Sequence, residues 1–175
     1  MTLRLPVESA PMAKLPAAPK GAEWAGPARV IDSLVYRVDG QGYVSEGYTH
    51  LFVMPAEGGT PRQLTKGAYD HGGTPVWSPD GRYLYFSANL DKDWRYQPVD
   101  SEIYRIAVGS GEITPLTDQD GPADQPAISP DGKQIAYVGF DDQRQSYQVS
   151  QLYLMDADGS NRRALAPGLD RDPGQ

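Results

Sequence analysis

The residues best suited to acid–base or nucleophilic chemistry in this chain are its two histidines, His50 and His71. His71 follows Asp70, and a histidine held by a carboxylate is the part of a Ser-His-Asp triad that activates the serine. The serine of a hydrolase commonly stands in a Gly-x-Ser-x-Gly turn. The nearest stretch here, residues 42–47 around Ser45, is one residue too long and lies in a loop. We therefore expect no catalytic residue in this chain.

Both histidines also have a structural interpretation. His50 opens a repeated strand at a position where Glu102 and Gln151 stand in the other repeats, which indicates a plain strand end. His71 precedes a repeated turn and is expected to hydrogen-bond to turn backbone, the alternative being that it points into a central channel. Asp70 and His71 have no third partner in the sequence, so we expect no metal site and no cofactor.

Two acidic stretches could attract cations. Residues 156–161 read Asp-Ala-Asp-Gly-Ser-Asn, but the glycine comes too early for a calcium-binding EF-hand loop, so a hairpin turn is expected. The second stretch is an acidic loop beside Trp94. It is interpreted as a solvated loop with one aromatic anchor, or as a surface that faces a partner domain or the positive N-terminus of a substrate. Its acidic residues are Asp91, Asp93, Asp100 and Glu102.

A repeat of about 50 residues must position these side chains. Residues 75–81, Pro-Val-Trp-Ser-Pro-Asp-Gly, return as Pro-Ala-Ile-Ser-Pro-Asp-Gly at 126–132, 51 positions later. In each copy the second proline presets φ, the aspartate can bond its own backbone, and the glycine closes the turn. A strand of alternating pattern follows each turn, at 83–87 and 134–138.

A hairpin repeats in constant phase with this turn. It starts at residues 50, 102 and 151, and each copy has glycine in its turn, where a tight hairpin needs positive φ. Each unit therefore contains four strand-like pieces and almost no helical period. Radially repeated four-stranded sheets of this length are the blades of a β-propeller. A flat sandwich also has short strands, but it does not explain why the repeated hairpin keeps a constant spacing from the repeated Ser-Pro-Asp-Gly turn.

The predicted fold class is all-β: a partial β-propeller of about three four-stranded blades, two full and one incomplete, not closed on its own. Closed propellers have about four to eight blades, and open blade ends invite self-association. The propeller segment is expected at 30–166, with units at about 30–65, 70–117 and 122–166 and a first strand region at 30–37. The inserts 89–101 and 140–150 fall at the same place in their units and should emerge from one face.

The ends of the chain have other expected roles. Residues 1–29 are rich in proline and alanine and are interpreted as an arm or linker, with one short strand near 3–7. Trp24 is expected to pack this arm onto the sheet, and stacking on a ligand is the alternative. Residues 167–175 are expected to form a frayed tail.

Composition excludes several classes of protein. The chain has no cysteine, so disulfides and Cys-based zinc sites are absent. A net charge of −7 without a basic cluster argues against a nucleic-acid partner. No apolar run approaches the roughly 20 residues of a membrane helix. The N-terminus has no apolar signal core, so the chain as written is expected in the cytoplasm, whereas loss of an upstream signal would allow a periplasmic or secreted location.

Seven stretches resemble the N-terminal β-propeller of bacterial serine peptidases of the prolyl oligopeptidase family, in the dipeptidyl aminopeptidase and acylaminoacyl peptidase branch. The resemblance covers about residues 20–166. The Ser-Pro-Asp-Gly repeat is shared with TolB-like (WD40-like) propellers and sugar-lyase propellers, whereas the loops 68–73, 100–104 and 139–142 favour the peptidase. The matching stretches are residues 21–25, 50–65, 77–82, 100–104, 128–137, 139–142 and 151–160.

The resemblance implies a non-catalytic propeller segment that gates peptide access to a C-terminal α/β-hydrolase domain, which the resemblance does not reach in this chain. The implied partners are that hydrolase domain of the parent chain and a peptide substrate passing through the propeller. A free-standing TolB-like module for protein binding is the alternative. A propeller-fold lyase acting on acidic sugars is a third hypothesis, but two histidines and a charge of −7 argue against it.

Overall fold

The computed structural model describes residues 1–7, 16–23 and 29–173 of the chain. The chain divides into two compact units, which are described separately. The larger unit consists of Met1–Leu5 and Tyr48–Gln175, and the smaller unit is Pro6–Gly47. Trp24, which was expected to anchor the arm, lies outside the described residues.

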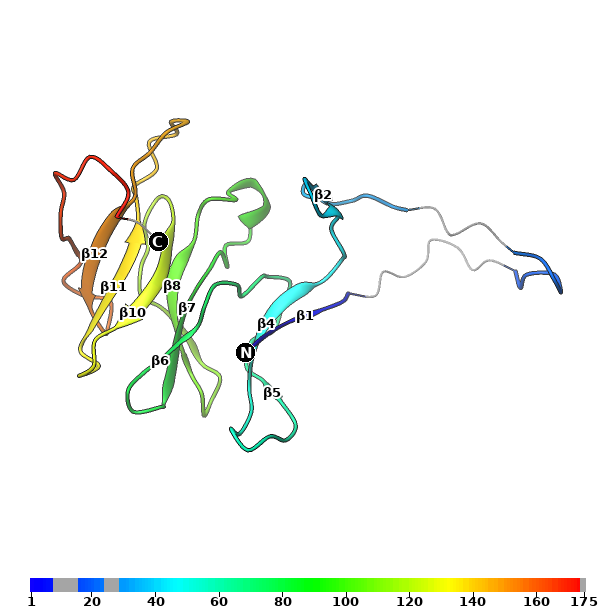
Figure 1. Cartoon of the computed structure of the whole chain (residues 1–175), viewed down its shortest axis with the longest axis horizontal. Coiled ribbons are helices and arrows are strands. Elements are labelled where there is room, and N and C mark those ends of the chain that lie inside the picture. Colours follow the sequence, from blue (N-terminus) through cyan, green and yellow to red (C-terminus); the bar gives the residue numbers. More distant parts are fainter. Residues whose placement is uncertain (8–15, 24–28, 174–175) are drawn as a thin grey trace. The chain divides into compact units, whose positions relative to one another are not determined.

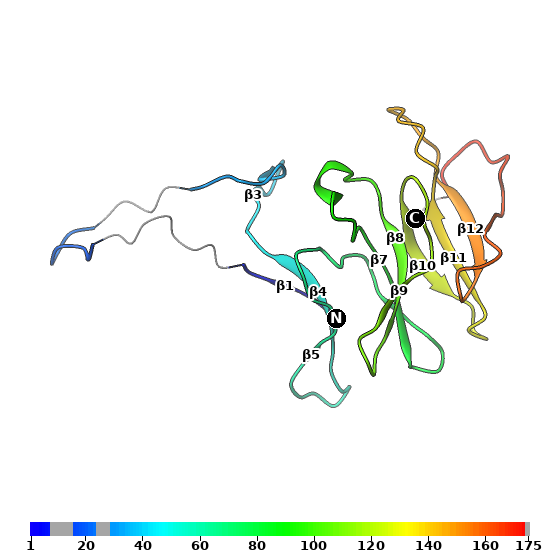
Figure 2. The same cartoon turned by 180° about the vertical axis from the view of Figure 1, so that it is seen from behind.

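Two four-stranded antiparallel sheets stand face to face in the larger unit (Figures 1 and 2). The second blade has the order β6-β7-β8-β9 and the third blade has the order β10-β11-β12-β13, so neighbours in the chain are neighbours in the sheet. With the three-stranded first sheet they form a partial, unclosed β-propeller, which confirms the predicted fold class. The strands are β6 (Val76–Trp77), β7 (Tyr83–Ala88), β8 (Glu102–Ala107), β9 (Ile113–Pro115), β10 (Ala123–Ile128), β11 (Gln134–Gly139), β12 (Gln151–Asp156) and β13 (Arg163–Ala164).

The repeated Ser-Pro-Asp-Gly sequence forms the same turn in both blades. The Gly81 N–H donates to the Ser78 carbonyl at 2.9 Å, and the Ser78 hydroxyl donates to Asp80 Oδ1 at 2.6 Å. The equivalent bonds around Ser129 are 2.8 Å and 2.6 Å. Gly81 and Gly132 have φ of 70° and 72°, a region in which a Cβ is strained. The turn therefore fixes where β7 and β11 begin.

The first sheet is built around the first copy of the hairpin. β4 (Tyr48–Val53) pairs with β5 (Arg62–Gln63) on one side and with β1 (Thr2–Leu5) on the other. Thr2 lies opposite Leu51, just as Ser87 lies opposite Ile103 in the second blade. Because Leu51 and Ile103 hold the same place in their hairpins, β1 takes the position of β7. The predicted short strand near 3–7 is confirmed, and it pairs into the first sheet.

The predicted strand region at 30–37 is wrong except at its last residue. In the described part of the smaller unit, β2 (Arg37–Val38) and β3 (Gly42–Tyr43) form a short hairpin. Residues 30–36 form no strand, and large apolar side chains such as Val30 and Leu34 are 53% and 58% exposed. A strand needs a neighbour for its backbone N–H and C=O groups. In the first sheet the place next to β4 is occupied by β1. A favourable strand composition at 30–36 is therefore not sufficient to make these residues a strand.

The smaller unit corresponds topologically to the two inserts. Pro6–Gly47 connects β1 to β4, the inserts 89–101 and 140–150 connect β7 to β8 and β11 to β12, and all three join the second strand position to the third. The sequence predicts the boundary between the arm and the propeller segment after residue 29. The first sheet does not begin there, because it includes β1. Within the described ranges no helix is long and apolar enough to cross a bilayer.

Two apolar clusters join the three sheets. Burial of each large aliphatic or aromatic side chain contributes about 1.5–3 kcal/mol, so these clusters are the main source of stability between blades. The cluster between the first sheet and the second blade contains Leu51, Leu64, Leu84, Phe86, Ala88 and Ile106. The cluster between the second and third blades contains Tyr85, Ile103, Leu116, Ala123, Ile135, Tyr137, Tyr153 and Met155.

Candidate functional site

An open pocket of about 460 Å³ lies where the insert 89–101 meets the start of the third blade. Its walls come from Asp70, Gly72 and Gly73, from the end of β7, from that insert, and from Pro122, Asp124 and Phe140. Three carboxylates line it, those of Asp70, Asp100 and Asp124. Among the described residues that line it there is no lysine, arginine or histidine. We call this site the acidic pocket.

Neighbouring groups hold the three carboxylates in place. Asp70 Oδ1 accepts a hydrogen bond from the Thr49 N–H at 2.6 Å and lies 3.2 Å from the Arg4 guanidinium. Asp124 accepts a hydrogen bond from the Ser87 hydroxyl. The Gly121 N–H donates to Asp100 at 3.3 Å. Because these contacts come from strands and connectors, and not from the insert alone, the carboxylates belong to the framework of the blades.

Burial raises the pKa of Asp100, and the carboxylates of Asp120, Asp91 and Asp142 raise it further, while the bond from the Gly121 N–H acts in the opposite direction. A carboxylate among other carboxylates is stabilised by an arriving positive charge. The pocket is therefore suited to an ammonium or guanidinium group. The Ser87 hydroxyl in its wall donates directly to the Asp124 carboxylate, without the imidazole that stands between serine and aspartate in a catalytic triad.

The short helix η1 (Trp94–Tyr96) brings an aromatic side chain to the same pocket. The Trp94 ring meets the Tyr48 ring edge to face, with centroids 6.4 Å apart. The Arg95 guanidinium donates to the Tyr48 hydroxyl at 3.2 Å. Of the acidic residues that the sequence singled out in this loop, only Asp100 lines the pocket. Asp91 instead accepts a hydrogen bond from the Asp93 N–H at 2.7 Å within the loop.

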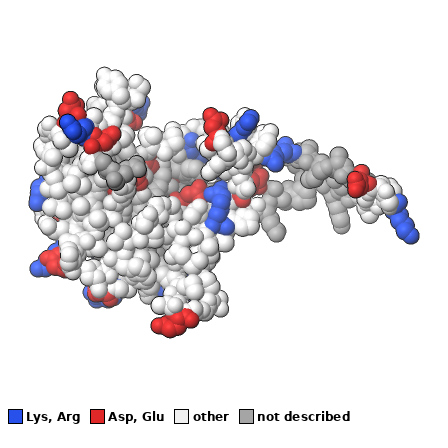
Figure 3. Space-filling model, viewed as in Figure 1, with Lys and Arg blue, Asp and Glu red and all other residues white. Residues whose placement is uncertain are grey.

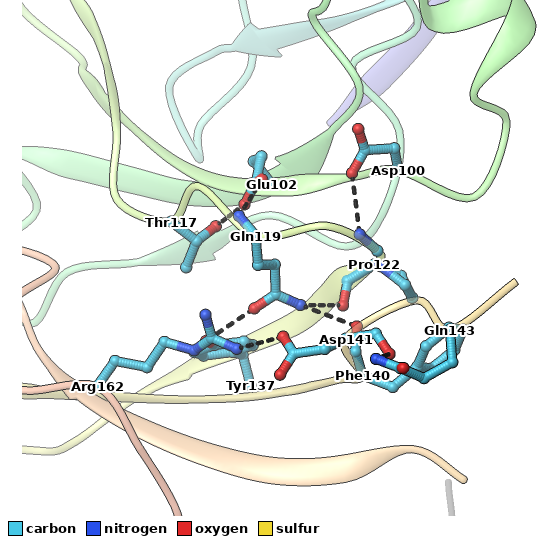
Figure 4. A network of polar contacts seen from close by, with 11 residues as sticks. Asp100, Glu102, Thr117, Gln119, Pro122, Tyr137, Phe140, Asp141, Gln143 and Arg162 are labelled. Carbon is cyan, nitrogen blue, oxygen red and sulfur yellow. Dashed lines mark hydrogen bonds and ion pairs between the residues drawn. The ribbon is translucent and has the colours of Figure 1, made fainter. Parts of the chain in front are cut away.

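Glu102 is part of a polar network next to the pocket (Figure 4). Its carboxylate accepts hydrogen bonds from the Thr117 hydroxyl and from the Gln119 N–H, the latter at 2.7 Å. The Gln119 side chain donates to the Pro122 carbonyl at 2.7 Å and accepts from the Tyr137 hydroxyl at 3.2 Å. The network therefore connects β8 of the second blade to β11 of the third blade.

Burial sets the protonation behaviour of this network. It raises the pKa of Glu102 from 4.5 to about 6, although the hydrogen bonds from Thr117 and Gln119 act in the opposite direction. It also raises the pKa of Tyr137 to about 12. The Arg162 guanidinium, 3.1 Å from the Asp141 carboxylate, lies beside this tyrosine (Figure 4). Glu102 can therefore change its charge in mildly acidic solution.

The first sheet contains a related arrangement with histidine. The Thr65 hydroxyl accepts from the Leu51 N–H at 2.9 Å, as the Thr117 hydroxyl accepts from the Ile103 N–H at 2.8 Å. His50 Nδ1 lies 3.3 Å from Thr65 Oγ1. His50 is therefore a buried member of a repeated polar contact, which its interpretation as a plain strand end did not capture.

The two histidines, far apart in the sequence, lie together in the fold. Their ring centroids are 5.2 Å apart, and they are 5% and 1% exposed. His71 Nδ1 lies 3.3 Å from the Thr49 carbonyl of β4, and the histidine also hydrogen-bonds to the backbone of Tyr69 in the preceding bend. Burial lowers the pKa of both His50 and His71. No group of three His, Asp or Glu side chains in the described part of the chain is placed to hold a metal ion.

The other two candidates have local roles. Ser45 follows β3 in the smaller unit, whereas His71 belongs to the larger unit. Asp158 accepts hydrogen bonds from the N–H and the hydroxyl of Ser160, at 2.9 Å and 2.6 Å, and so forms the expected hairpin turn. Basic side chains of the described residues are scattered over the face shown in Figure 3, and they do not gather into one patch.

Comparison with known proteins assigns the chain to a family. Residues 35–136, more than half of the chain, match the model of the dipeptidyl peptidase IV (DPP IV) N-terminal region. The chain belongs to this family. The resemblance inferred from the loops and repeats of the sequence is thereby confirmed.

Individual relatives share only part of their length with the chain. The protein Atu1656 of Agrobacterium fabrum is 31% identical over 132 residues, which are 74% of this chain and 39% of that protein. The peptidase YuxL of Bacillus subtilis is 40% identical over 60 residues, 34% of this chain and 9% of the peptidase. A TolB-type protein from Agrobacterium tumefaciens has a similar structure, with a TM-score of 0.52, 26% identity and coverage of 66% of this chain and 40% of that one. The chain thus spans about two fifths or less of these proteins.

Proposed function

We propose that the chain is a non-catalytic propeller segment of a serine peptidase of the prolyl oligopeptidase family, which gates peptide access to a C-terminal α/β-hydrolase domain. The match to the DPP IV N-terminal region over residues 35–136 is the observation that carries this proposal. The similarity to the peptidase YuxL supports the same assignment. The hydrolase domain would supply the catalytic residues, and the propeller would select which peptides reach it.

The acidic pocket is the part of the segment that contacts the peptide in this proposal. Three carboxylates around one open space favour the positive end of a peptide over a neutral one, because the Coulomb attraction is strengthened in a partly buried site. Trp94 provides an apolar surface for the adjacent residue of the peptide. The proposal therefore assigns to the pocket the selection of peptides with a free ammonium group.

Tryptophan fluorescence tests this assignment on the chain itself. The chain is titrated with Ala-Ala-Ala and with its N-acetylated form, and Trp94→Phe verifies that the signal comes from the pocket. We expect saturable binding of the free peptide, at least tenfold weaker binding of the acetylated peptide, and a similar loss in Asp100→Asn. Glu112→Gln, at an exposed turn outside the pocket, is the matched control and should bind as the wild type does. Equal binding of both peptides would remove the pocket from the proposal.

A free-standing TolB-like protein-binding module is the second candidate. The structural similarity to the TolB-type protein from Agrobacterium tumefaciens favours it. The two candidates differ in the size of the native protein, because only the peptidase requires a hydrolase domain in the same polypeptide.

A further inference from the structure

Glu102 lies next to the acidic pocket, although it does not line it. Asp100 and Ser101 line the pocket, and Glu102 opens β8 at the following residue. Two residues of extended chain span about 7 Å, so the carboxylates of Asp100 and Glu102 are close enough to affect each other. The charge of Asp100 is indeed one cause of the raised pKa of Glu102. A positive charge that reaches Asp100 therefore also interacts with Glu102.

Hydrogen bonds connect Glu102 to the third-blade wall of the pocket. The Gln119 N–H donates to the Glu102 carboxylate at 2.7 Å, and the side chain of Gln119 is only 7% exposed. This side chain donates to the carbonyls of Pro122 and Phe140, at 2.7 Å and 3.4 Å (Figure 4). Pro122 and Phe140 both line the pocket. Gln119 therefore holds the carboxylate of Glu102 at a fixed place relative to this wall.

The groups around Glu102 oppose its ionisation or are neutral. Its two hydrogen-bond donors are a hydroxyl and a backbone N–H, and neither brings a positive charge. The carboxylates of Asp100 and Asp118 raise its pKa. Glu102 in turn raises the pKa values of Tyr104 on its own strand and of Tyr137 on β11, so both phenols are neutral around pH 7. A cation bound in the pocket would therefore favour the ionised form of Glu102.

We propose that Glu102 is a specificity-determining residue of the acidic pocket: its ionised carboxylate strengthens the binding of an ammonium group beside Asp100, and a proton on Glu102 weakens that binding. The inference rests on the ammonium recognition of the proposed function, and it adds a residue outside the pocket wall that regulates this recognition. The coupling is reciprocal, so a bound ammonium group favours loss of the proton from Glu102. A neutral ligand is not subject to this coupling. Glu102 therefore increases the preference for charged over neutral peptides as the pH rises.

Other groups at the pocket also titrate and must be separated from Glu102. The pKa of Asp100 is raised, so protonation of Asp100 weakens ammonium binding in the same direction. The buried pair His50 and His71 adjoins Asp70 of the pocket wall, and protonation of either histidine adds a positive charge that opposes a cation. Glu102→Gln leaves all these groups in place, keeps an oxygen acceptor and removes only the charge of Glu102. Comparison of this variant with the wild type therefore isolates the effect of Glu102.

Titration of the 175-residue chain with Ala-Ala-Ala at pH 5 and at pH 7, followed by the fluorescence of Trp94, tests the inference. Glu102 is mostly protonated at pH 5 and mostly ionised at pH 7, whereas the ammonium group of the peptide, with a pKa of about 8, keeps most of its charge at both. We expect Glu102→Gln to bind the peptide as the wild type does at pH 5 and about fivefold more weakly at pH 7. Glu112→Gln, the same substitution at an exposed turn outside the pocket, is the matched control and should follow the wild type at both pH values.

N-acetylated Ala-Ala-Ala separates the charge of Glu102 from a merely structural role. We expect Glu102→Gln to bind the acetylated peptide as the wild type does at pH 7, because a neutral peptide end is not coupled to the carboxylate. The inference is overturned if the variant weakens binding of both peptides equally, or if it binds the free peptide as the wild type does at both pH values. Equal binding of the two peptides by the wild type would instead contradict the ammonium recognition of the proposed function, so the two failures are distinguishable.

Discussion

The carboxylate of Glu102 should make the stability of the chain depend on pH in a direction opposite to that of most acidic residues. Its pKa is about 6 in the folded chain, against an ordinary value of 4.5. The folded state therefore holds this proton more tightly than the unfolded state does. The stabilisation is fully present below pH 4.5 and is lost as the pH rises through about 6. The difference between the two pKa values sets an upper limit of about 2 kcal/mol, which solvent screening of this partly exposed carboxylate reduces.

Glu102→Gln removes this titration and keeps an oxygen acceptor for Thr117 and Gln119. Urea unfolding of the wild type and the variant, at pH 4 and at pH 7.5, gives four free energies of unfolding. Titrations of other groups, including the two histidines, are common to both proteins and cancel in the difference. We expect the stability of the variant relative to the wild type to increase by about 1–2 kcal/mol between pH 4 and pH 7.5.

The reasoning is refuted if that difference is the same at both pH values, or if it shifts in favour of the wild type. A second variant tests the cause of the pKa. Thr117→Val removes a donor that lowers the pKa of Glu102. The pH-dependent loss of stability should therefore extend to higher pH in Thr117→Val than in the wild type.

Three further predictions follow from other parts of the structure. Gly139→Ala should destabilise the chain by about 3 kcal/mol in urea unfolding, because a Cβ would lie 2.1 Å from the Pro122 carbonyl oxygen, whereas Gly109→Ala has open space and should change little. The lowered pKa values of His50 and His71 mean that the unfolded chain takes up protons first, so the contribution of these two histidines to stability, which opposes that of Glu102, should fall as the pH drops below 6.5. That fall should be smaller in His71→Gln, and an equal fall would contradict the assignment. The isolated chain should not hydrolyse aminoacyl chromogenic substrates, and activity that co-purifies with the chain and survives serine-protease removal would contradict this.

The repeated turns and hairpins could be predicted because their information is local. Serine, aspartate and glycine within four residues suffice to form the turn at Ser78 and again at Ser129, with matching hydrogen bonds. Two copies in constant phase then indicate blades. The fold class therefore followed from pattern alone, without any long-range contact.

The parts that could not be predicted depend on contacts between distant segments. β1 is a strand because β4 lies beside it, while residues 30–36 have a better strand composition and no such neighbour in the sheet. The acidic pocket combines Asp70 and Asp124, which are 54 positions apart, with the insert 89–101. No local spacing indicates that these side chains meet, nor that His50 and His71 lie together.

The central claim is that the chain works as a propeller segment within a peptidase. The most direct test is the intact mass of the native gene product in the source cell, detected through a peptide from residues 77–117. The account predicts a mass several times 19.1 kDa, with a hydrolase domain in the same polypeptide. A native mass of 19.1 kDa would contradict the gating role and would favour the free-standing TolB-like module.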